Sequence, residues 1–354
     1  MAFSMNYSLS AQDVLTHPEM PKRLQQMRHA GVKHLWLYGF FYGHHESAPE
    51  QLIRARRRLL DEGFETGVLS LPVGHPGNSL NPEDPTLNLA IHNEWHYRID
   101  RHGKKEYFIA CIDDIMTRHN RSAAEMYAQM GFTRHFYDDD LRLGNWGEQV
   151  QGCFCDHCIQ QFNDMHGLCL TRAQLAEACD GTTGMEEIRE AWIQFNCDKL
   201  TRFMRDTQVP GMASGIMVMH NGDRRHGISI PDIRRAVPGC MFRVGELHFN
   251  DASYATPKGQ ESLASSVRAH MALIGDNPVY SESTVFPAEA LSPENLLHRI
   301  RLELSLGLRN IFLMSGTWYL SEPYWNLLVQ NRSALETLAD ELDAIHDTVH
   351  EDDK

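Results

Sequence analysis

Short apolar runs alternate with longer amphipathic stretches along most of the chain, and this alternation constrains the fold more than any other feature. The short runs are rich in β-branched, aromatic and aliphatic residues and are bounded by glycine or proline, which is typical of strands. The runs that we expect to form strands are residues 33–38, 66–71, 107–112, 133–137, 213–219, 241–246, 278–281 and 310–314. The stretches that we expect to form helices are residues 49–62, 122–130, 185–207, 230–237, 261–274, 293–306 and 323–350. Eight strands that alternate with helices predict a parallel sheet covered by helices.

Eight such units can close once into a (β/α)8 barrel, which needs about 250 residues. The chain has 354 residues, and two insertions, at about 74–106 and 141–184, account for the excess. We expect the first insertion to contain a β-hairpin at residues 95–108. A doubly wound sheet usually carries a glycine-rich phosphate loop after its first strand, and the segment Gly-Phe-Phe-Tyr-Gly at 39–43 is not such a loop. We therefore expect a single TIM barrel over residues 1–354.

The composition excludes several classes of function. The formal net charge is −14, so the chain has no general attraction for nucleic acid or for anionic lipid. No apolar stretch is long enough to cross a bilayer, and the first residues lack the pattern of a secretory signal, so we expect a cytoplasmic protein. Eight cysteines in such a chain predict free thiols and a metal site rather than a disulfide framework.

Polar and aromatic residues gather where the expected strands end. They are Asp113 and Asp114 after the third strand, Asp138, Asp139 and Asp140 after the fourth, His220 and Asn221 after the fifth, Glu246 and His248 at the sixth, Glu282 at the seventh, and Trp318 and Tyr319 after the eighth. In a barrel these ends converge on one mouth, where active sites are built. Rings stack on the apolar faces of sugars while carboxylates and amides bind hydroxyl groups, so the set indicates a carbohydrate site. Tyr42, in the loop after the first expected strand, is a further stacking candidate.

Each of these residues also has a structural interpretation. Glu282 lies in the run Tyr-Ser-Glu-Ser-Thr, and a buried carboxylate without a partner is costly, so a salt-bridged core glutamate is the alternative. The same alternative holds for Glu246. Asp138, Asp139 and Asp140 could belong to a solvated capping loop, and His220 could be a hydrogen-bonded core histidine.

Three cysteines lie within six residues, in the segment Gly-Cys-Phe-Cys-Asp-His-Cys at 152–158. Thiolates are preferred ligands of tetrahedral zinc, and the spacing lets Cys153, Cys155 and Cys158 face one ion. A fourth ligand must come from elsewhere in the chain. This motif predicts a structural zinc site beside the acidic segment 138–140.

The cysteine motif, following an acidic motif at the fourth strand, resembles the catalytic barrel of glycoside hydrolase family 42, a β-galactosidase-like family with a zinc–cysteine cluster. The resemblance is specific over about residues 103–162 and implies that Cys111 supplies the fourth thiolate. It also implies that Glu282, at the seventh strand, is the nucleophile. The triplet at 138–140 and the pattern Glu-x-x-x-Phe-Pro, met by Glu282, Phe286 and Pro287, resemble a group of uncharacterised glycosidase-like proteins as well.

The sequence departs from family 42 in two respects. The family has a glutamate after an asparagine at the fourth strand, where this chain has Asp139 and Asp140. A shorter acid widens the gap between the carboxylates, which favours inversion over retention. We expect the family's C-terminal domains, which help to form its trimer, to be absent, so substrate specificity and oligomeric state do not carry over and a homo-oligomer stays open.

These observations predict a glycoside hydrolase that acts on a small glycoside or oligosaccharide with two carboxylates. We expect Glu282 to be the nucleophile or base and Asp140 the acid/base, with Glu246 as the alternative partner. The expected substrate-binding residues are Asp139, His220, Asn221, Tyr42, Trp318 and Tyr319. A metal-dependent sugar isomerase or epimerase, with Asp140, His220, Glu246 and Glu282 around a divalent cation, is one alternative. A non-catalytic carbohydrate-binding barrel is the other.

Overall fold

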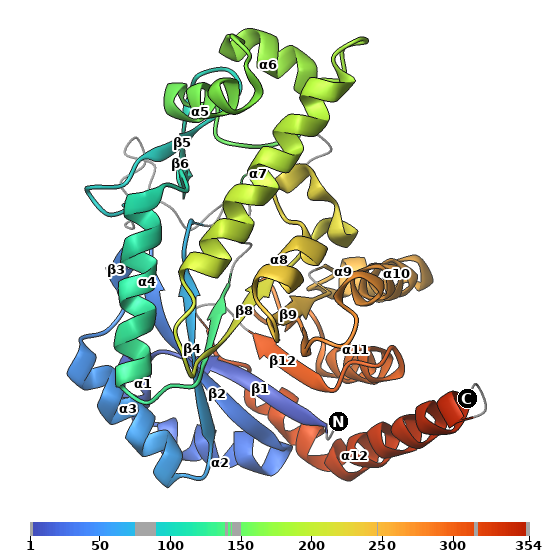
Figure 1. Cartoon of the computed structure of the whole chain (residues 1–354). Coiled ribbons are helices and arrows are strands. Elements are labelled where there is room, and N and C mark those ends of the chain that lie inside the picture. The colour runs from blue at the N-terminus through green and yellow to red at the C-terminus, as the bar shows by residue number, and fades with distance from the viewer. Residues whose placement is uncertain are drawn as a thin grey trace.

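The computed structural model of the chain is a closed barrel of eight parallel strands surrounded by helices, which confirms the expected fold class (Figure 1). The structure describes residues 3–74, 90–138, 141, 143, 150–245, 247–314 and 318–351, and the side chains of 108, 220 and 345–351 are not described. The barrel strands are β1 (Ser4–Leu9), β2 (Val32–Phe41), β4 (Glu65–Leu71), β7 (Arg134–Tyr137), β8 (Ala213–Met217), β9 (Met241–Val244), β10 (Val279–Ser281) and β12 (Asn310–Met314). Pairing of β1 with both β12 and β2 closes the ring.

Two strand predictions were wrong, and the two errors cancel in the strand count. The first barrel strand, β1, was missed because its serines and asparagine interrupt the apolar run, although all six of its residues are buried. The run at 107–112 was assigned to the barrel, but β6 (Lys105–Ala110) instead pairs antiparallel with β5 (Tyr97–Ile99) in a separate hairpin. The hairpin itself was expected. The fourth and later strands therefore keep their predicted numbers.

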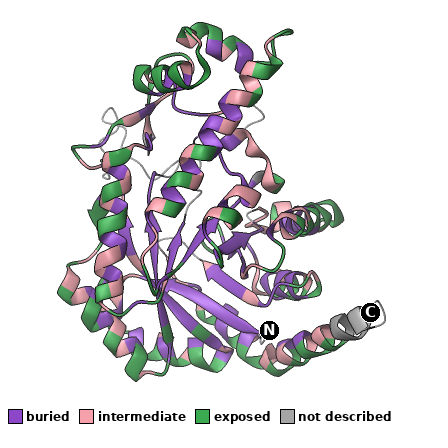
Figure 2. Cartoon of the chain, in the orientation of Figure 1, coloured by how far each residue is buried: buried purple, intermediate pink, exposed green. Residues whose placement is uncertain are grey.

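Helices cover the outside of the barrel, with their apolar faces inward and their polar faces exposed (Figure 2). The larger ones are α2 (Met20–Ala30), α3 (Pro49–Asp61), α4 (Asp114–Gln129), α7 (Glu186–Asp206), α8 (Ile230–Ala236), α10 (Pro257–Ile274), α11 (Pro293–Ser305) and α12 (Glu322–Glu351). Helix α4 begins eight residues before the expected start, because the Asp113 carboxylate accepts hydrogen bonds from the amides of Ile115 and Met116 and caps it. Among the described residues, no helix combines the length and the apolar character that a membrane span needs.

Two insertions extend from the carboxyl ends of β4 and β7. The first holds the β5–β6 hairpin, and the second holds α5 (Asp156–His166) and α6 (Arg172–Cys179). Figure 1 shows these elements together beyond one end of the barrel, beside the first turns of α7. The second insertion and α7 enclose a small separate core, to which the insertion contributes Phe154 and Phe162 and α7 contributes Trp192 and Phe195.

The barrel interior is filled by large side chains, with Trp36, Phe136, Tyr280 and Phe312 at its centre. The Trp36 ring lies 4.9 Å from Phe136 and 5.6 Å from Phe312, between ring centroids. A Cβ atom at Gly67 would overlap the Trp36 ring, so a larger residue does not fit there. Since side chains on a strand alternate in direction, the residues two positions further along point to the same interior, one layer nearer the mouth.

Candidate active site at the barrel mouth

The layer above the aromatic residues contains a buried group of charges. Arg243, two residues after Met241 on β9, donates a hydrogen bond from Nε to Oε2 of Glu282 at 3.0 Å, and its Nη2 lies 2.8 Å from the same oxygen. Its Nη2 also forms an ion pair with Asp138. Arg243 is 1% exposed, Glu282 is 6% exposed and Asp138 is 2% exposed. One guanidinium therefore joins carboxylates from the fourth and seventh barrel strands, and the group carries a net negative charge.

The surroundings of Arg243 fix its position. Its guanidinium carbon lies 5.1 Å from the centroid of the Phe312 ring, and Nη2 lies 3.1 Å from the sulfur of Met217. The Thr284 hydroxyl donates to the other oxygen of Glu282 at 3.2 Å. A hydrogen-bonded guanidinium favours the ionised form of both carboxylates.

Tyr38, on β2, completes this layer with a neutral donor. Its hydroxyl lies 3.2 Å from the Ser8 hydroxyl of β1. Burial raises the pKa of Tyr38 well above its ordinary value, and the nearby charge of Asp138 acts in the same direction. The phenol therefore stays protonated at neutral pH and can donate a hydrogen bond.

A second buried arginine holds the backbone on which Glu282 stands. Arg299, on α11, donates from Nη2 to the carbonyl oxygens of Gly245, at 2.7 Å, and of Glu282. Its Nε donates to Glu303 at 2.9 Å, and the other oxygen of Glu303 accepts from the Ser283 hydroxyl at 2.5 Å. Both Arg299 and Glu303 are fully buried. The ends of the sixth and seventh barrel strands are thus tied to one helix, which limits the movement of Glu282.

Several of the predicted site residues lie outside the described part of the chain. These are Asp139, Asp140 and Glu246, and the side chain of His220 is also not described. Asn221 is described: it is exposed and has a left-handed backbone, with φ of 57°, in a short 3-10 helix. The pairing of Asp140 with Glu282 therefore stays a prediction.

The three aromatic candidates occupy different surroundings. Trp318 is half-buried and its ring lies 5.6 Å from that of Phe286, a residue that is 55% exposed. Tyr319 is packed, since its hydroxyl donates to Asp13 and a guanidinium covers its ring. Tyr42 is fully buried and presents no face to a ligand. The rings that a sugar could reach are those of Trp318 and Phe286.

Sequence reasoning missed Arg243. It stands in the apolar strand Met-Phe-Arg-Val, and its inward direction follows from the alternation with Met241. A charge at an inward-facing position needs a buried partner of opposite sign, and that rule would have led from Arg243 to the carboxylates at neighbouring strand ends.

The four predicted metal ligands do lie together, away from the barrel axis. The Sγ atoms of Cys111, Cys153, Cys155 and Cys158 are all within 4.8 Å of one another, and those of Cys111 and Cys158 are 3.6 Å apart. Tetrahedral zinc with Zn–S bonds of about 2.3 Å requires sulfur separations of about 3.8 Å. The group therefore fits a single metal ion.

Local structure explains how the cysteines meet. Cys155 is the N-cap of α5, and its sulfur accepts from the amide of Cys158 at 3.4 Å. Cys111 comes from the other insertion, directly after β6. Hydrogen bonds from Cys111 and then Cys153 lower the pKa of the Cys158 thiol to about 7, which favours the thiolate that a metal binds.

His92, Glu94 and His119 form a second group of side chains whose residue types can bind a metal. Their contacts make this group a hydrogen-bond network instead. The Trp95 indole donates to Nδ1 of His119 at 3.1 Å, so the proton of the neutral ring is on Nε2. That nitrogen lies 3.4 Å from Glu94. A protonated nitrogen has no lone pair for a metal.

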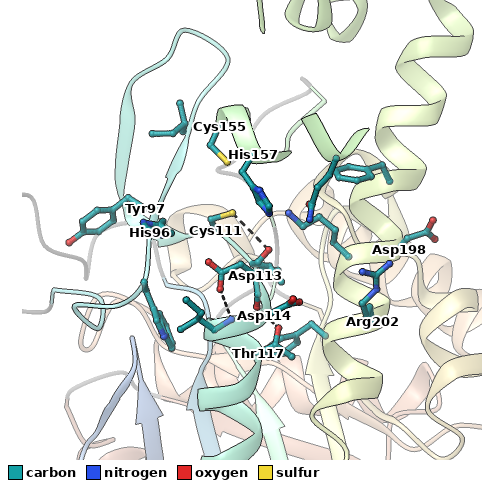
Figure 3. A pocket seen from close by; sticks show the side chains of 18 of the residues that line it. His96, Tyr97, Cys111, Asp113, Asp114, Thr117, Cys155, His157, Asp198 and Arg202 are labelled. Carbon is teal, nitrogen blue, oxygen red and sulfur yellow. Dashed lines mark hydrogen bonds between the residues drawn. The ribbon is translucent and has the colours of Figure 1, made fainter. Parts of the chain in front are cut away.

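A cavity of about 1080 Å³ lies between the hairpin, α4, α5 and α7. Figure 3 shows Cys111, Cys155 and His157 at one side of it and Asp198 and Arg202 on α7 at another. No sequence motif indicated this cavity, because its walls come from four separate segments. Two of the four clustered cysteines, Cys111 and Cys155, line it.

Comparison with known proteins gives likeness in structure but no match in sequence. No protein-family model and no curated protein sequence matches this chain. The chain is similar in structure to the PgaB (BpsB) glycoside hydrolase domain from Bordetella bronchiseptica, with a TM-score of 0.60 and 12% sequence identity. The match covers 96% of this chain and 98% of that one. At this identity the likeness shows a shared barrel fold.

Proposed function

We propose that the protein is a glycoside hydrolase whose substrate binds at the barrel mouth. The observation that carries this proposal is the placement of Glu282 and Asp138 on Arg243, at the carboxyl ends of the seventh and fourth barrel strands. Active sites of TIM barrels lie at this end. The structural likeness to a glycoside hydrolase domain supports the same class of reaction.

In this proposal Glu282 acts as the ionised carboxylate, either as the nucleophile or as the base that activates water. Arg243 keeps it ionised, and the bonds from Arg299 hold its backbone in place. Asp140, two residues beyond Asp138, is the proposed acid that protonates the leaving oxygen. Glu246 is the alternative acid.

Turnover of activated aryl glycosides tests these roles. We expect Glu282→Gln to lower turnover by orders of magnitude with the fold retained, and azide to restore part of the activity of Glu282→Gly if Glu282 is the nucleophile. Asp140→Asn and Glu246→Gln then show which residue is the acid. Near-wild-type turnover by Glu282→Gln would show that this residue is a structural partner of Arg243.

We further propose that the four-cysteine group binds one structural zinc ion. Four thiolates form a closed tetrahedral site with no position for substrate, so the ion would brace the two insertions. Elemental analysis should find about one zinc per chain, and Cys155→Ser should lose it. Purified protein without metal, even after supply of zinc, would contradict this proposal.

A further inference from the structure

A lysine from the barrel's own helix faces the four-cysteine group. Lys199, on α7, lies with its ammonium nitrogen 3.1 Å from Sγ of Cys158. The same ammonium lies 5.6 Å from the centroid of the Phe195 ring, which is part of the core around the cysteines. Among the described residues, no other cationic side chain donates a hydrogen bond to one of the four sulfurs.

The charge of the site explains why a cation belongs there. Four thiolates around one divalent ion carry a net charge of −2, and this charge lies in a largely apolar core that includes Phe154, Phe162 and Trp192. A buried net charge is costly unless an opposite charge or hydrogen bonds offset it. One hydrogen-bonded ammonium halves that net charge.

We infer that Lys199 is part of the metal site, as the residue that offsets its charge and holds Cys158 in position to bind. This inference rests on the proposed metal binding by the cysteines. Partners of this kind outside the ligand set typically contribute 10- to 100-fold in metal affinity. Lys199 also connects the site to α7, so the metal would join both insertions to a helix that packs on the barrel.

The test compares zinc affinity in variants of the full chain. Lys199→Met removes both the charge and the hydrogen bond, Lys199→Gln keeps a donor without charge, and Lys199→Arg keeps both. Arg202→Met is the matched control, because Arg202 is an exposed cation on the same helix that also lines the cavity. Affinity is measured by competition with a chromophoric chelator, and Co²⁺ loading by the thiolate-to-cobalt absorption band.

We expect about a 10- to 100-fold loss of zinc affinity in Lys199→Met, a smaller loss in Lys199→Gln, and wild-type affinity in Lys199→Arg and Arg202→Met. If Lys199→Met does not fold, the comparison of zinc affinity between Lys199→Gln and Lys199→Arg provides the same test. Equal affinities in wild type and the folded Lys199 variants, or an equal loss in Arg202→Met, would overturn the inference. Wild-type protein that binds neither metal would instead reject the metal site itself.

Discussion

Replacement of Arg243 by methionine tests whether the buried charges at the mouth form one interdependent group. In the wild type, Arg243 joins Asp138 and Glu282, and all three residues are less than a tenth exposed. Methionine fills a similar volume but leaves two buried carboxylates without their cation. The hydrogen bond from Thr284 to Glu282 would remain, but it is a neutral donor and does not replace the lost positive charge.

The expected cost is large. Removal of one partner from a buried ion pair costs about 3–5 kcal/mol, and because two carboxylates share this cation we expect the upper part of that range. The ratio of folded to unfolded protein would then fall by about three to four orders of magnitude. Arg243→Lys keeps the positive charge but not the forked geometry of the guanidinium, so its loss of stability should be intermediate.

Urea unfolding followed by tryptophan fluorescence measures these differences. Addition of Asp138→Asn and Glu282→Gln to Arg243→Met should restore most of the stability, because neutral amides leave no buried charge uncompensated. If Arg243→Met alone stays within about 1 kcal/mol of the wild type, the three residues do not form the group described above.

Three further predictions concern the core and the mouth. Burial lowers the pKa of His135 to about 3, against about 6.5 when unfolded, so stability should fall by about 2 kcal/mol from pH 6.5 to pH 5. His135→Gln should remove that part of the pH dependence. The prediction is contradicted if the free energy of unfolding changes equally with pH in the wild type and in this variant. Gly215→Ala should cost about 1–3 kcal/mol because its Cβ would overlap the Phe136 ring, and Phe136→Leu in the same chain should recover part of the loss in thermal unfolding experiments. Trp318→Ala should weaken sugar binding measured by calorimetry while the buried Tyr42→Phe leaves it unchanged, and the reverse result would move the binding surface elsewhere.

The sequence predicted the barrel because its strands are marked by apolar runs with breaks between them. It failed at β1, where the alternation of Ser4, Asn6 and Ser8 with apolar residues does not look like a fully buried strand. The polar side of this strand has partners inside the barrel: the Asn6 side chain accepts from the Trp36 indole at 3.0 Å. Such partners come from distant segments, so composition within a short window does not reveal them.

The candidate sites differ in how far sequence could define them. The motif at Cys153, Cys155 and Cys158 is local, so spacing alone identified three candidate ligands, whereas Cys111 was found only through the family resemblance. Glu282 was identified by its position at a strand end. Arg243 was missed because its importance depends on two partners that fold brings from 105 and 39 positions away in the chain.

The aromatic layer inside the barrel has a consequence for how a long ligand would move. Trp36, Phe136 and Phe312 are fully buried and Tyr280 is 5% exposed, so the layer closes the barrel below the charged group. A polymer cannot thread through this protein from one end to the other. It can only lie across the mouth or enter it end first, and whatever is released must leave through the same opening by which it arrived.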